Sequence, residues 1–146
     1  MLLVNVKHRL QFLEAMIDVL VEHARISFEG DLSRSRRVLD AIPGATTQPS
    51  GALQRHTMPP HLGIEFMIVP LEPTTRDILM RRVLPQIGIR KHVFHVQIEK
   101  EGQLQLMAYD NFHPECVTVG PLVSEDLLRL LVEKHILRTY TAIMDV

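Results

Sequence analysis

The chain of 146 residues suits one ordinary domain with its own hydrophobic core. Hydrophobic residues make up 46% of it and charged residues 23%, a balance that excludes global disorder. The formal net charge of −1 provides no overall field for nucleic acid or anionic lipid, which argues against a nucleic-acid-coating or membrane-surface protein. The single cysteine cannot form an intrachain disulfide, and this favours a reducing, cytoplasmic compartment.

The N-terminal segment predicts a helix from about Asn5, as N-cap, to Ala24, because apolar residues recur at three- and four-residue steps. Charged side chains interrupt these residues, so we expect neither a signal peptide nor a membrane span. Phe12, Met16 and Val19 add a second apolar flank, whereas a surface helix needs only one. This flank is either packed inside the protein or exposed as an interface with a partner.

Two shorter elements are expected next. Residues 24–30, "ARISFEG", alternate between apolar and polar, which predicts a half-buried strand closed by a glycine. Residues 31–44 predict a short helix that begins at Ser33 or Ser35 and stops at Pro43.

Arginines gather in the first turn of this short helix, where the helix dipole disfavours cations. We interpret Arg34, Arg36 and Arg37 as a solvated basic turn, and the alternative is a contact with phosphate or an acidic partner. Together with Arg55 they define a nucleic-acid-binding alternative, which the overall charge disfavours.

The segment 43–63 shows no periodicity and holds seven of the chain's sixteen proline and glycine residues. Loops of this length without secondary structure are uncommon in compact domains and tend to be functional or disordered. We expect a lid or a partner-binding loop, with Arg55, His56 and His61 as its polar contacts.

A strand and a helix follow this loop. Residues 63–73, "GIEFMIVPLEP", are apolar on both faces, which predicts a central strand. Residues 73–88 predict a helix that opens with a capping-box variant, Thr74 to Asp77, and that Pro85 breaks.

The clearest element is a β-hairpin over residues 91–110. We expect a three-residue loop, Lys100–Gly102, because it pairs apolar residues with apolar residues across the two strands. This register sets His92 opposite Asp110 at the end of the hairpin. The expected opposite pairs are Phe94 with Ala108, Val96 with Leu106 and Ile98 with Leu104.

A short strand at residues 116–120 and a final helix, with Ser124 as its N-cap, complete the expected elements. Their order favours an α+β fold, with a mixed α/β arrangement as the alternative. We predict one domain over residues 1–146, with one mainly antiparallel sheet of about four or five strands packed by about four helices.

The candidate site is the stretch "AYDNFHPEC", residues 108–116, which gathers acids, an imidazole and the only thiol. With His92 from the hairpin, Asp110, His113 and Cys116 supply the side chains for a Cys–His nucleophile, for acid–base catalysis or for zinc binding. No familiar metal-ligand spacing is present, and no metal is predicted. The preferred interpretation is a polar turn between strands, in which Asp110 favours an Asx turn and His113 is extended before proline.

No nucleotide-binding, zinc-protease or hydrolase motif occurs in the sequence, so no cofactor is predicted. The leading hypothesis is a small cytoplasmic, non-enzymatic protein of the regulatory, adaptor or immunity type that binds a macromolecular partner. A protein partner is expected, with a homodimer as one form. The alternative is a small hydrolase-like enzyme or metal-binding protein that uses the 108–116 loop with His92. The expected partner contacts are Phe12, Met16, Val19, Arg55 and His56.

Overall fold

A computed structural model of the chain describes residues 1–57 and 63–143. No described helix has the length and the continuous hydrophobicity that crossing a bilayer requires. The strands are β1 (Leu2–Val6), β2 (Ala24–Gly30), β3 (Glu65–Leu71), β4 (Val93–Lys100), β5 (Gln103–Ala108), β6 (Val117–Val119) and β7 (Leu137–Ala142). The helical segments are α1 (Arg9–Leu20), α2 (Arg36–Ala41), α3 (Pro73–Ile78), the π-helical stretch η1 (Leu79–Val83), α4 (Leu84–Ile87) and α5 (Glu125–Glu133).

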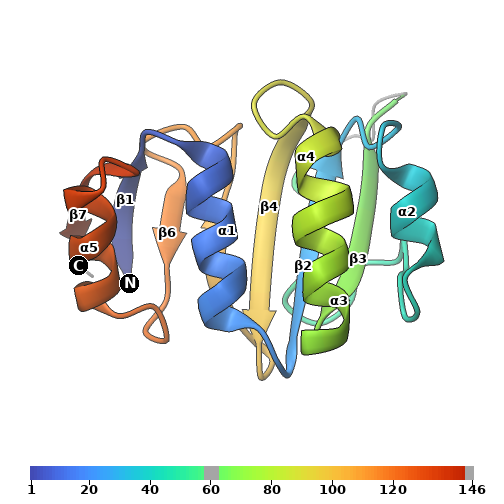
Figure 1. Cartoon of the computed structure of the whole chain (residues 1–146), viewed down its shortest axis with the longest axis horizontal. Helices are drawn as coiled ribbons and strands as arrows, with labels where there is room; N and C mark the ends of the chain where they lie inside the picture. The colour runs from blue at the N-terminus through green and yellow to red at the C-terminus, as the bar shows by residue number, and fades with distance from the viewer. Residues whose placement is uncertain (58–62, 144–146) are drawn as a thin grey trace.

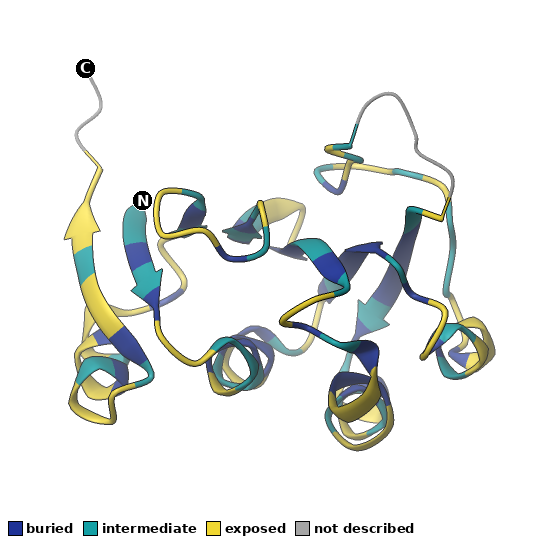
Figure 2. Cartoon of the chain, turned by 90° about the horizontal axis from the view of Figure 1, so that it is seen from above, coloured by how far each residue is buried: buried dark blue, intermediate teal, exposed yellow. Residues whose placement is uncertain are grey.

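The seven strands form one antiparallel sheet in the order β3-β2-β4-β5-β6-β1-β7. The helices form a layer on one face of this sheet (Figure 1 and Figure 2). Buried aliphatic and aromatic side chains between the sheet and the helices make up the main core. This arrangement confirms the predicted α+β class with one antiparallel sheet, although seven strands exceed the predicted four or five.

The two strands that account for this difference, β1 and β7, lie next to each other at one end of the sheet. β1 occupies residues expected to begin the first helix, so the predicted N-cap at Asn5 is wrong and α1 begins after His8. In so short a segment, strand alternation and the helical period place apolar residues at overlapping positions. β1 becomes a strand because it pairs with β6 and β7, with Val4 opposite Tyr140.

The second apolar flank of α1 packs inside the protein. Phe12 and Met16 are both 0% exposed and belong to the main core. The Phe12 ring meets the Phe112 ring edge to face, with the ring centroids 6.4 Å apart. Phe12 and Met16 therefore offer no surface to a partner, contrary to the interface alternative. Val19, the third residue of this flank, is 39% exposed.

The hairpin of β4 and β5 has a different register from the predicted one. Its turn consists of Glu101 and Gly102, both left-handed with φ of 53° and 81°, as the twist of a two-residue hairpin requires. A bulge further along the strands then sets Val96 opposite Ala108. The predicted three-residue loop is wrong. Beyond the bulge the pairing is shifted by two residues, which keeps the side chains on their predicted faces, but next to the turn Leu104 lies on the face opposite to the predicted one.

The helix after β3 continues where the sequence predicts a break. Its N-cap is Glu72, which forms a capping box with Thr75, so the predicted start at Thr74 is wrong. The π-helical stretch η1 places Pro85 in the first turn of α4, where the missing N–H of proline is tolerated. The helix therefore passes Pro85 and ends at Gly88, which is left-handed.

Residues 45–57 cross the face of the sheet opposite the helices, and we refer to them as the strap (Figure 2). They belong to the predicted 43–63 loop, of which residues 58–62, His61 among them, lie outside the described residues. Leu53 of the strap is fully buried against Phe66 and Ile68 of β3. This cover explains why β3 is apolar on both faces although it lies at the sheet edge, and not in the predicted central position.

Candidate functional site

The loop after β5, predicted as the site, leaves the sheet in a left-handed turn. Asp110, Asn111 and Phe112 have φ of 52°, 55° and 60°, a conformation that non-glycine residues adopt uncommonly. The Asn111 main-chain N–H donates to the Phe94 carbonyl at 2.7 Å, and its side-chain Nδ2 donates to the Arg90 carbonyl at 2.7 Å. Phe112 is buried in the core. Core packing and hydrogen bonds thus account for the shape of this loop.

The four predicted catalytic residues are not brought together. The hairpin register separates His92 from Asp110, and His92 lies instead 3.8 Å from the Asp31 carboxylate. Asp110 and His113 are exposed, and Cys116 is half-buried. Within the described ranges no hydrogen bond or ion pair joins two of these four side chains. Nor does the described part of the chain place three or more His, Cys, Asp or Glu side chains around a potential metal position.

A different set of side chains, which we call the ring cluster, meets beside this loop: His56 from the strap, His95 from β4 and Tyr109 at the end of β5. The His56 and Tyr109 ring centroids are 4.1 Å apart, and the His95 centroid lies 5.7 Å from each. The Gln97 side-chain oxygen lies 3.3 Å from His56 Nε2 and accepts a hydrogen bond from Tyr109 Oη at 3.4 Å. The Asp110 main-chain N–H donates to His95 Nδ1 at 3.1 Å.

The ring cluster was not predicted, because His56 was assigned to a partner-binding loop and because the expected pairs Phe94 with Ala108 and Val96 with Leu106 place His95 opposite Met107. In the structure Gln97 is the residue opposite Met107. The available signal was the alternation of β2 and β4, since both strands carry polar side chains on one face, with Ser27 opposite Gln97. A polar face on two neighbouring interior strands indicates that a polar segment covers it.

The strap is attached to this polar face through a buried carboxylate. Glu29 is 1% exposed and accepts main-chain N–H bonds from His56 at 2.8 Å and from Thr57 at 2.9 Å. The Gln97 amide donates to the Gln54 carbonyl at 2.9 Å. These bonds compensate the burial of the polar groups and hold the His56 ring over the sheet.

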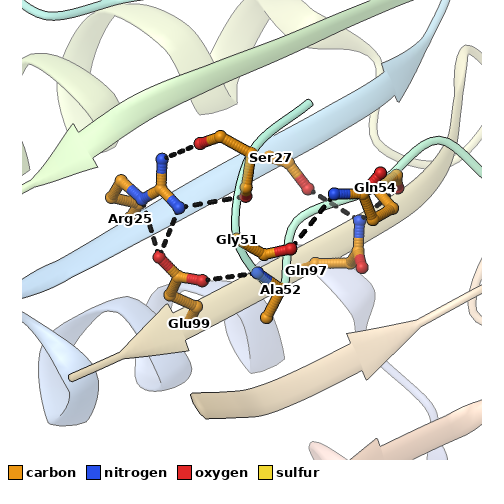
Figure 3. A network of polar contacts seen from close by, with 8 residues as sticks. Arg25, Ser27, Gly51, Ala52, Gln54, Gln97 and Glu99 are labelled. Atoms are coloured by element: carbon orange, nitrogen blue, oxygen red, sulfur yellow. Dashed lines mark hydrogen bonds and ion pairs between the residues drawn. The ribbon is translucent and has the colours of Figure 1, made fainter. Parts of the chain in front are cut away.

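A second attachment holds the middle of the strap (Figure 3). The Glu99 carboxylate accepts the main-chain N–H of Ala52 at 3.1 Å and a hydrogen bond from Arg25 Nε at 2.7 Å. Arg25 Nη1 donates to the Ser50 hydroxyl at 2.6 Å. The buried Glu99 is therefore both charge-paired and hydrogen-bonded, the condition under which a buried carboxylate is stable.

The arginines considered for partner or nucleic-acid binding are partly engaged within the protein. The Arg55 guanidinium carbon lies 5.5 Å from the centroid of the Phe66 ring, in a cation–π contact. Arg36 pairs with Asp40 at 3.0 Å and with Glu65 at 3.1 Å. The basic first turn of α2 is thus partly neutralised by neighbouring acids.

Burial of the His95 ring lowers its pKa below the ordinary value of 6.5. The Glu29 and Asp110 carboxylates act in the opposite direction, whereas His56 adds to the lowering. The folded protein therefore favours the neutral ring, which accepts the Asp110 N–H at Nδ1. Unfolding takes up a proton at this ring between its folded pKa and its unfolded pKa.

We expect the free energy of unfolding to fall as the pH decreases from about 6.5 through the lower pKa of folded His95, and to be independent of this group at higher pH. Urea denaturation at a series of pH values measures the decrease. His95→Gln should make it shallower, because glutamine does not titrate and can still accept the Asp110 N–H. Equal slopes in the wild type and the variant would contradict this expectation.

A second candidate surface is a groove of about 520 Å³ between α1 and α5, which we call the α1–α5 groove. Val19 on the α1 side is 39% exposed, and Leu130 on the α5 side is 43% exposed. The polar lining consists of Gln11, Glu14, Asp18 and Lys134. The apolar lining consists of Ala15, Val19, Leu127, Leu130, Leu131 and Ile136.

Several large apolar side chains are exposed, and two of them, Val19 and Leu130, line the α1–α5 groove together. Single exposed apolar residues are ordinary, but a group of them marks an interaction surface. Met1 precedes β1, and the Ile143 N–H donates to its carbonyl at 3.3 Å. The residues of this kind in the described ranges are Met1, Val19, Leu122, Leu130 and Ile143.

The chain matches no protein-family model, no curated protein and no solved structure. The two candidate surfaces are therefore compared by their geometry alone. The side chains of the ring cluster contact one another and Gln97 beneath the strap, and none of them lines the α1–α5 groove or the smaller cavities near Gly120 and Gly88. The α1–α5 groove, in contrast, is a hollow with exposed apolar walls.

Proposed function

We propose that this protein binds another protein through the α1–α5 groove and has no catalytic activity. The observation that carries the proposal is the exposure of Val19 and Leu130, two large apolar side chains that line the same hollow from different helices. Fully burying an exposed side chain of this kind contributes about 1.5–3 kcal/mol, and the part of Val19 and Leu130 that is still exposed contributes a corresponding share in an interface. A regulatory, adaptor or immunity protein would use a surface of this kind.

The polar sites support catalysis less well. No hydrogen bond or ion pair joins two of the side chains of His92, Asp110, His113 and Cys116 within the described ranges. The two histidines of the ring cluster could exchange protons with a substrate, but the His56 main chain holds the strap through Glu29, and the His95 ring accepts the Asp110 N–H at the left-handed turn. Binding through the α1–α5 groove requires neither the 108–116 loop nor the ring cluster.

Selection of peptides from a displayed random library on the folded protein tests this proposal. We expect the enriched peptides to bind the double variant Val19→Asp with Leu130→Asp at least about tenfold more weakly than the wild type, because each carboxylate opposes the burial of apolar surface. Fluorescence anisotropy with the enriched peptides measures the change in Kd.

Leu122→Asp is the matched control for this experiment. Leu122 is 47% exposed but lies outside the groove, so the variant should bind the enriched peptides as the wild type does. Thermal unfolding of the double variant verifies that it is folded, which we expect since both substituted side chains are exposed. Peptides that bind the double variant and the wild type equally well would place the binding surface elsewhere.

A further inference from the structure

We infer that the segment occupying the α1–α5 groove is an amphipathic α-helix of a different protein, with a basic side chain directed at Glu14. This inference rests on the proposed function and adds the chemistry of the partner. Three features carry it: the helical walls of the groove, its concave shape and the charges on its two sides.

The helical walls favour a helical occupant. α1 and α5 satisfy their main-chain N–H and C=O groups internally, so they present no main-chain partners along the groove. An extended peptide lying between them would leave its own main-chain groups unpaired against apolar side chains. A helix satisfies these groups itself and presents only side chains to Val19 and Leu130.

The concave shape disfavours a second copy of this chain. A two-fold contact brings identical surface patches together, so two grooves would face each other across an unfilled space. An interface needs a packing density like that of a protein interior, and two hollows cannot provide it. A convex ridge of side chains on a helix fills a groove of about 520 Å³ better.

The charges on the two sides differ. Glu14 on α1 is half-buried and forms no ion pair within the described ranges, whereas its neighbour Asp18 is bound by Arg76. Lys134, at the end of α5, is exposed on the other side and also has no ion pair within those ranges. A partner helix with a basic residue on its α1-facing flank would compensate the half-buried carboxylate of Glu14.

The length of the groove limits the contact. From Gln11 to Val19, α1 runs along the groove for about 12 Å, or roughly two turns of helix. This length accommodates apolar anchors in the i, i+3 or i+4, i+7 pattern of helix-in-groove recognition. The partner is therefore expected to contribute a short helix with one apolar stripe and a lysine or arginine beside it.

A set of three fluorescent peptides of about 14 residues tests this inference. The first carries leucines at i, i+4 and i+7 with a lysine on one flank and is held helical by a side-chain staple. The second has glutamate in place of that lysine. The third is unstapled and has two central prolines, which prevent a helix. Anisotropy titrations give the Kd of each peptide for the wild type, Glu14→Lys and the charge control Glu133→Lys.

On the wild type we expect the lysine peptide to bind about fivefold more tightly than the glutamate peptide, as for a partly exposed ion pair. The proline peptide should bind at least about tenfold more weakly than the lysine peptide. Glu14→Lys should reverse the preference between lysine and glutamate. Glu133→Lys should leave it unchanged, because Glu133 lies outside the groove.

Leu130→Asp separates the two proposals. If it abolishes binding while Glu14→Lys causes no reversal, or while the proline peptide binds as well as the helical ones, the inference about the partner helix is overturned and the groove remains the binding surface. If Leu130→Asp weakens none of the peptides, the binding they show is not in the groove, and the proposed function fails with the inference.

Discussion

Replacing Phe12 with alanine is expected to lower the free energy of unfolding by about 3–5 kcal/mol, the usual cost of deleting a buried aromatic ring. The side chain is 0% exposed and packs edge to face on Phe112, so its removal leaves a cavity in the main core. It also removes a contact that keeps Phe112 in its left-handed turn. Urea denaturation of the variant and the wild type measures the loss.

Val19→Ala, on the same helix, is the matched control. Val19 is 39% exposed, and we expect its truncation to change the free energy of unfolding by less than about 1 kcal/mol. The two variants therefore separate the buried part of the apolar flank from its exposed part. Equal losses for Phe12→Ala and Val19→Ala would contradict the packing of α1 described above.

Gly30→Ala is expected to cost about 3 kcal/mol or more of unfolding free energy. Gly30 ends β2 with φ of 156°, beside a bulge in the pairing with β4. A Cβ atom there would lie far inside van der Waals contact of the His92 carbonyl oxygen and 2.9 Å from Val93 Cα. Both obstacles are main chain, so the sheet itself would have to move.

Gly102→Ala is the control, because Gly102 also has a positive φ but has free space where a Cβ atom would lie. It has φ of 81° in the hairpin turn, and a Cβ atom there would meet nothing within 4 Å. We expect a cost of about 1 kcal/mol from the left-handed conformation alone. In thermal unfolding followed by circular dichroism, Gly30→Ala should have a clearly lower melting temperature than Gly102→Ala. The reverse order would contradict the close approach of β2 to His92.

The local parts of the fold could be predicted from the sequence. Alternation marks β2 and β4, and Ser124 begins α5 by accepting the Leu127 N–H at 3.2 Å. The register of the hairpin could not be predicted, because the bulge at Ile98 and Glu99 depends on pairing and not on composition. β7 exposes most of its side chains and shows little apolar pattern, so only its pairing with β1 identifies it.

The candidate surfaces were harder to predict because each joins distant segments. His56 reaches His95 only because Glu29 binds the main chain of the strap, and that bond has no local sequence signal. Val19 was expected to contact a partner as part of an apolar flank, whereas Leu130 lies on α5 and was not singled out. Their common groove depends on how α1 and α5 pack on the sheet, which periodicity alone does not specify.

The way in which the strap is attached affects how its sequence can evolve. Glu29 and Glu99 bind the main-chain N–H groups of His56, Thr57 and Ala52, so the identity of those three side chains is irrelevant to the bonds. Any residue except proline, which lacks the donor, preserves them. Mutation can therefore change the side chains of the strap while the two glutamates in the sheet hold its main chain in the same position.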